Sequence, residues 1–65
     1  MKTIEELQLE VYQHYSKAID QAGLAELHAI EKKIARHYDN GTLSAEQFQR
    51  LDLRVFEGLA IGDVI

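Results

Sequence analysis

The histidines are the side chains of this chain best suited to bind a transition metal, but their spacing does not form a site. His14, His28 and His37 include no pair four residues apart, the spacing that places two imidazoles on one face of a helix. The chain also has no cysteine, so it has no thiolate ligand. The sequence therefore predicts no metal site, and the histidines are interpreted as surface or interface-rim side chains.

The segment 40–44 resembles the second half of a calcium-binding loop, in which glycine makes a sharp turn and an apolar residue follows two positions later. In that alignment Arg36 and Tyr38 occupy the first and third ligand positions, and Gln47 replaces the glutamate of the twelfth. Since an arginine in a ligand position repels a cation, we interpret this segment as a junction between two helices.

The residue types needed for nucleophilic catalysis are present, but they lack the neighbours that activate them. Thr3 and Ser44 stand where helix caps are expected. Ser16 has no accompanying histidine–acid arrangement, and the chain has no glycine-rich phosphate-binding loop. We therefore predict a non-enzyme that uses no cofactor.

The chain is acidic, with a formal net charge of −4 at pH 7. Binding to DNA depends on neutralising phosphates with lysine and arginine, so the overall composition argues against it. The alternative hypothesis is a transcriptional regulator that contacts DNA through a local basic patch. The residues of that patch would be Lys32, Lys33, Arg36, Arg50 and Arg54.

The middle of the chain combines the signals that end one helix and begin another. Gly41 can adopt the left-handed conformation that terminates a helix. Ser44 is a good N-cap, and Gln47 three residues later can complete a capping box. The sequence therefore predicts a tight helical hairpin with its turn at 39–44.

Two helical patterns precede this turn. Thr3 and Glu6 form a second capping box, which opens a helix. Its predicted core stripe repeats every three or four residues, at Ile4, Leu7, Val11, Tyr15, Ala18 and Ala22. The following stripe has the same spacing, at Leu24, Leu27, Ile30, Ile34 and Tyr38.

These two stripes do not share one helix face. At about 100° per residue the second is displaced by roughly 140° from the first, and the shift falls at Gly23. Either Gly23 ends the first helix in a left-handed cap that folds Leu24 back onto Ile19, or a single helix continues and each half faces a different partner. We expect a break or a kink.

The third helix has one apolar stripe that matches the second helix and further apolar residues on another side. The predicted fold is an all-α bundle of about three helices, at about 4–22, 25–39 and 45–59, in one domain over residues 1–65. So short a chain has little core of its own, and we expect a homodimer to complete it. The predicted interface residues are Leu9, Tyr12, Ile19, Leu53 and Phe56. Docking to a host or regulatory protein is the alternative use of the same surface.

Residues from about 24 to 60 resemble the short helical module called SHOCT. The resemblance is carried by segment 38–48, in which tyrosine, an acidic residue and glycine lead through Leu43 and Ser44 to a second helix with an early phenylalanine. Leu43 replaces the usual isoleucine, Ser44 the threonine, and Gln47 stands where an acidic residue is common. This resemblance implies oligomerisation or protein contact.

The whole chain is also similar in style to the small accessory proteins encoded between the exonuclease and excisionase genes of lambdoid phages. That resemblance implies a phage regulatory protein that acts by binding. No apolar run approaches the ~18 residues of a membrane span, and the N-terminus lacks a signal-peptide pattern. We therefore expect a cytoplasmic protein, in the host bacterial cytoplasm if it is phage-encoded, with no membrane partner.

Overall fold

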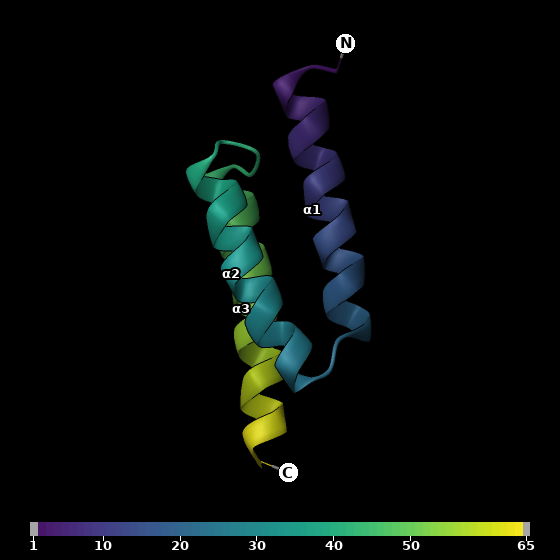
Figure 1. Cartoon of the computed structure of the whole chain (residues 1–65), viewed down its shortest axis with the longest axis vertical. Helices are drawn as coiled ribbons and strands as arrows, with labels where there is room; N and C mark the ends of the chain where they lie inside the picture. Colours follow the sequence, from purple (N-terminus) through teal and green to yellow (C-terminus); the bar gives the residue numbers. More distant parts are fainter. Residues whose placement is uncertain (1, 65) are drawn as a thin grey trace.

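The protein folds as three α-helices joined by two short connections (Figure 1). The computed structural model describes residues 2–64, with side chains as far as Ile61. Helix α1 spans Ile4–Gln21, α2 spans Leu24–Asp39 and α3 spans Ala45–Val64. Neighbouring helices run in opposite directions, which confirms the predicted all-α bundle. Helix α3 ends five residues later than expected and continues through Gly58 and Gly62. Among the described residues only Gly41 has the positive φ that ends a helix, so these two glycines do not terminate α3.

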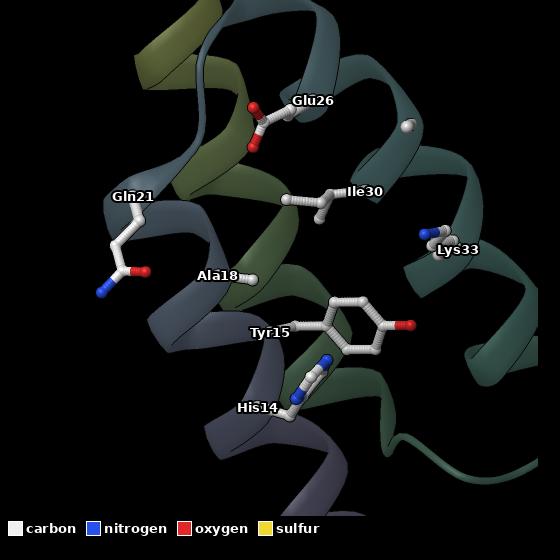
Figure 2. A pocket seen from close by; sticks show the side chains of 8 residues that line it. His14, Tyr15, Ala18, Gln21, Glu26, Ile30 and Lys33 are labelled. Carbon is white, nitrogen blue, oxygen red and sulfur yellow. The ribbon is translucent and has the colours of Figure 1, made fainter.

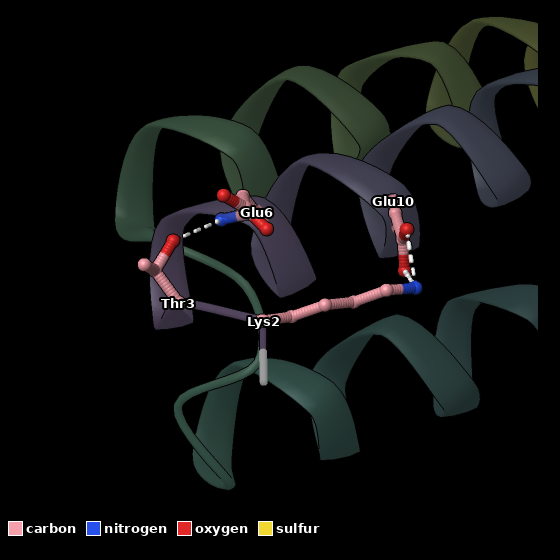
Figure 3. A network of polar contacts seen from close by, with 4 residues as sticks. All are labelled: Lys2, Thr3, Glu6 and Glu10. Carbon is pink, nitrogen blue, oxygen red and sulfur yellow. Dashed lines mark hydrogen bonds and ion pairs between the residues drawn. The ribbon is translucent and has the colours of Figure 1, made fainter.

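Helix α1 begins at the predicted cap. The hydroxyl of Thr3 accepts a hydrogen bond from the backbone N–H of Glu6, at 3.2 Å. The Lys2 ammonium group lies 2.5 Å from the Glu10 carboxylate, so it ties the preceding residue to the side of the helix (Figure 3). The Lys2 and Glu10 side chains are 59% and 50% exposed, so the contribution of this ion pair to stability is at most about 1 kcal/mol.

The turn between α2 and α3 has the two predicted signals. Gly41 has a φ of +80°, its N–H donates to the carbonyl of Tyr38, and the N–H of Thr42 donates to the carbonyl of His37. This pair of bonds is the Schellman motif. Two residues on, the Ser44 N–H donates to the Gln47 side chain at 3.1 Å, and the Gln47 N–H donates to the Ser44 hydroxyl at 3.2 Å. The capping box is therefore complete in both directions.

The helix breaks at Gly23, but by a different geometry from the one considered. Ala22 and Gly23 are both extended, with φ of −86° and −83°, and Gly23 is the N-cap of α2. A left-handed cap with Leu24 folded onto Ile19 is therefore wrong, and Leu24 is 45% exposed. The chain reverses direction through two consecutive residues in the extended conformation, a backbone conformation that any amino acid can adopt.

The core lies mainly between α2 and α3, and α1 packs across them with its C-terminal half. Its buried residues are Ile19, Leu27, Ile30, Ile34, Leu43, Leu51 and Val55. Gly58 allows α2 and α3 to approach closely, since a Cβ there would lie 2.9 Å from a methyl group of Leu27. The first turns of α1 are not part of this core: Ile4 and Leu7 were expected to face inward, but both are exposed.

We expect different effects from alanine at the two glycines of the connections. Gly41→Ala should lower the free energy of unfolding by about 1–2 kcal/mol, because an L-residue is disfavoured at positive φ. Gly23→Ala should change it by no more than about 0.5 kcal/mol, because φ is ordinary and nothing lies within 4 Å of an added Cβ, so the entropy gain offsets the loss of a better N-cap residue. Urea unfolding of both variants measures the difference. Equal effects would contradict the assigned backbone geometry.

Candidate functional site

Among the described side chains of α3, three large apolar ones are exposed: Leu53, Phe56 and Ile61. Phe56 is 67% exposed and Leu53 is 57% exposed, and they lie one helical turn apart. Ala60, one turn beyond Phe56, is also exposed. Asp52 and Glu57 flank this pair in sequence, and neither makes an ion pair with another described residue. We call Asp52, Leu53, Phe56, Glu57 and Ala60 the outer face of α3.

The other three predicted interface residues lie elsewhere. Leu9 is half exposed on α1, and Tyr12 is partly buried against the core. Ile19 is buried in the core, so the expectation that it lies on a surplus apolar surface is wrong. The physical reason is the reversal after α1, which brings α2 against the last turns of that helix. The structure therefore does not gather the five predicted residues on one surface.

A groove separates α1 from α2 (Figure 2). It encloses a hollow of about 400 Å³, with Tyr15 and Ala18 on the α1 wall and Ala29, Ile30 and Lys33 on the α2 wall. The remaining lining residues, at the polar rim, are His14, Gln21 and Glu26. The small side chains Ala18 and Ala29 leave this space open, and Figure 2 shows the Tyr15 ring and Ile30 between the two helices.

Part of the predicted basic patch lies on the α2 wall of this groove. Lys32, Lys33 and Arg36 surround a second hollow of about 280 Å³ that also includes Ala29. Lys33 and Ala29 line both hollows, so the two adjoin along α2, but every lining residue of the second hollow belongs to α2. None of the three cations forms an ion pair with a carboxylate of the described residues. We call the two hollows together the α1–α2 groove.

The two arginines of α3 belong to other interactions. Arg50 pairs with Glu46 one turn earlier at 2.7 Å, and Arg54 pairs with Asp20 and Ser16 of α1. Arg54 therefore joins α3 to α1. The five basic residues of the DNA hypothesis do not form one patch, since only the three on α2 share a surface.

A line of polar side chains links α1 to the hairpin turn. The Thr42 hydroxyl donates to the carbonyl of His37 at 3.0 Å, so its oxygen is free to accept from His37 Nδ1 at 2.7 Å. His37 Nε2 then accepts from the Tyr15 hydroxyl at 3.2 Å. Burial raises the pKa of the Tyr15 phenol above its usual 10.0. Sequence reasoning missed this network, although Thr42 and His37 stand at the two positions that the Schellman motif brings into contact.

This network fastens the turn and offers no evident reaction. The Thr42 hydroxyl is engaged as a donor to backbone, so it does not resemble a nucleophile that donates to a base. Within residues 2–64 no three histidine or acidic side chains cluster closely enough to hold a metal ion. Over the same residues no helix has both the length and the apolarity to cross a bilayer.

We expect the stability of the protein to fall as the pH rises above about 10, the unperturbed pKa of tyrosine. The raised pKa means that folded Tyr15 keeps its proton where the unfolded chain has lost it, so the unfolded state gains stability with rising pH. Tyr15→Phe should reduce this alkaline loss. At neutral pH it should destabilise by about 0.5–1.5 kcal/mol, because His37 Nε2 loses its donor. Urea unfolding over an alkaline pH series tests both effects, and an unchanged pH profile in the variant would contradict them.

Comparison of the chain with protein-family models, curated proteins and solved structures gives no match.

Proposed function

We propose that this protein is a small, acidic, non-enzymatic interaction module that associates with a second copy of itself through the outer face of α3, with the homodimer as its smallest assembly. The observation that carries the proposal is the exposure of Phe56 and Leu53, at 67% and 57%, on adjacent turns of one helix. Large apolar side chains that are contiguous and rimmed by charges are typical of protein contact surfaces.

The size of the chain supports the same proposal. Among the side chains that the structure describes, the core contains seven buried apolar ones, none of them aromatic. A domain of 65 residues buries a smaller fraction of its surface than a larger domain does, so contact with a second copy would add stability that one chain lacks. Each Å² of apolar surface removed from water contributes about 25 cal/mol. The resemblance to SHOCT supports oligomerisation or protein contact, and the resemblance to phage accessory proteins supports a regulatory or host-modulating role exerted by binding.

The experiment is a concentration series of two-dimensional ¹H–¹⁵N NMR spectra of the whole chain, from low micromolar to millimolar. Association through α3 should shift the amide signals of Leu53, Phe56 and Ala60 as the concentration rises. Signals from the exposed side of α1, such as those of Gln13 and Lys17, serve as the internal control. Spectra that do not change with concentration would contradict self-association, and shifts confined to α1 would contradict the assigned surface.

A further inference from the structure

The α1–α2 groove and the outer face of α3 are separate surfaces that differ in shape and in the sign of their unpaired charges. The hollow between α1 and α2 is lined by one cation, Lys33, and one carboxylate, Glu26, and two further cations, Lys32 and Arg36, surround the adjoining hollow on α2. None of the three cations forms an ion pair with a described carboxylate. The outer face of α3 is a convex helix surface with two exposed apolar side chains and two unpaired carboxylates. Resting on the proposed self-association, we infer that the outer face of α3 in one copy docks into the α1–α2 groove of the next copy.

The hollow between α1 and α2 can accommodate an apolar side chain of the outer face of α3. The hollow of about 400 Å³ lies in the range of ligand pockets, ~300–1,000 Å³, and is therefore large enough for an aromatic ring such as that of Phe56. Its walls include the small apolar side chains Ala18 and Ala29, which supply apolar contact without filling the space. A helix laid along this groove would be the fourth helix of an antiparallel bundle, a common arrangement for packed helices.

The charges favour this occupant over a second α3. Docked beside α2, the Asp52 and Glu57 carboxylates would come near Lys32, Lys33 and Arg36, and both sets of charges would gain partners. A two-fold contact that joins α3 to α3 would bury the same Phe56 but leave the three cations of α2 in solvent. The groove contact therefore places carboxylates beside the three cations of α2, which outnumber the one carboxylate of the groove lining, Glu26.

This contact joins two different surfaces, so it is heterologous. Each docked pair retains one free groove and one free α3 face. Such contacts continue from copy to copy and produce either a closed ring or an open filament. The wild-type assembly is therefore expected to exceed two chains at high concentration.

The test mixes two variants that each lack one surface. Phe56→Asp removes the apolar anchor of α3 but keeps the groove, and Ala29→Glu obstructs the groove but keeps α3. Both positions are exposed, so both variants should fold. Alone, each should associate at least ~30-fold more weakly than wild type, the loss typical of removing a central contact. Mixed in equal amounts, they should form a one-to-one complex that stops at two chains, about twice the 7.4 kDa chain mass by light scattering.

A charge variant checks the electrostatic part separately. Lys33→Glu should weaken wild-type association about tenfold, and the loss should diminish at high salt, as for charges at the rim of an interface. Lys17→Glu makes the same charge change on α1, at a residue that lines neither hollow, and should have little effect.

The outcomes separate this inference from the function on which it rests. If Ala29→Glu associates as strongly as wild type while Phe56→Asp does not, α3 pairs with itself and the groove assignment is wrong. If the two variants stay monomeric when mixed, the complementary-surface model is also wrong. If wild type itself never exceeds one chain, the proposed self-association fails, and the groove contact fails with it.

Discussion

Leu51→Ala is expected to lower the free energy of unfolding by about 2–5 kcal/mol, the range for truncating a fully buried leucine. Leu51 is 0% exposed and lies in the centre of the core between α2 and α3. In a chain of 65 residues a single core rarely supplies more than about 3–5 kcal/mol, so this loss should leave a substantial unfolded population at room temperature. Thermal and urea unfolding, followed by circular dichroism at low protein concentration, measure it.

Leu53→Ala is the matched control for this prediction. It removes the same three carbons two residues away, but Leu53 is 57% exposed. Its effect on the stability of the monomer should be within about 0.5 kcal/mol. Equal losses at the two positions would contradict the assignment of Leu51 to the core and Leu53 to the solvent-facing side.

Phe56→Asp is expected to weaken self-association by at least about 30-fold, because a charge would replace the most exposed large apolar side chain of the outer face of α3. The stability of the monomer should change by no more than about 0.5 kcal/mol, since Phe56 contributes little to the core of its own chain. Dissociation on dilution, followed by calorimetry, gives the association constant, and urea unfolding of dilute protein gives the stability.

Gln13→Asp controls for the added negative charge, since Gln13 is exposed on α1 and lines neither hollow. It should leave association nearly unchanged. If Phe56→Asp associates as wild type does, the outer face of α3 is not the contact surface. If both variants weaken association equally, net charge and not the apolar contact controls it.

The elements of the fold were predictable because their signals are local. The Thr3 cap, the Gly41 termination and the reciprocal Ser44–Gln47 box each depend on residues within five positions of one another. The last two occur as expected, and the predicted Thr3–Glu6 box forms the bond to the Thr3 hydroxyl. The stripe on α3 also follows from periodicity, since Leu51 and Val55 are buried and Leu53 is exposed. Local chemistry therefore fixed the helices and the hairpin turn.

The packing of α1 was not predictable in the same way. Periodicity assigned Ile4 and Leu7 to the core and Ile19 to the surplus surface, whereas Ile4 and Leu7 are exposed and Ile19 is buried. These outcomes depend on where α2 turns back after Gly23 and on how closely α1 approaches it. A stripe on one helix gives the direction of its apolar face, but it does not give the length along which another helix covers that face.

The candidate site also has some features that depend on one helix and others that depend on contacts between helices. The exposure of Leu53 and Phe56 follows from their angular position on a single helix. The hollow between α1 and α2 follows only from the distance between two helices, and the pairing of Arg54 with Asp20 requires α1 and α3 to be adjacent. The grouping of Lys32, Lys33 and Arg36 and the pairing of Arg50 with Glu46 are local to one helix each.

The most direct test is sedimentation equilibrium of the wild-type chain over micromolar to millimolar concentrations. It measures whether the chain self-associates, as the exposed apolar surface of one protomer predicts. The average mass should rise with concentration from 7.4 kDa to at least twice that value. A folded species that remains at 7.4 kDa across the whole series would contradict the account.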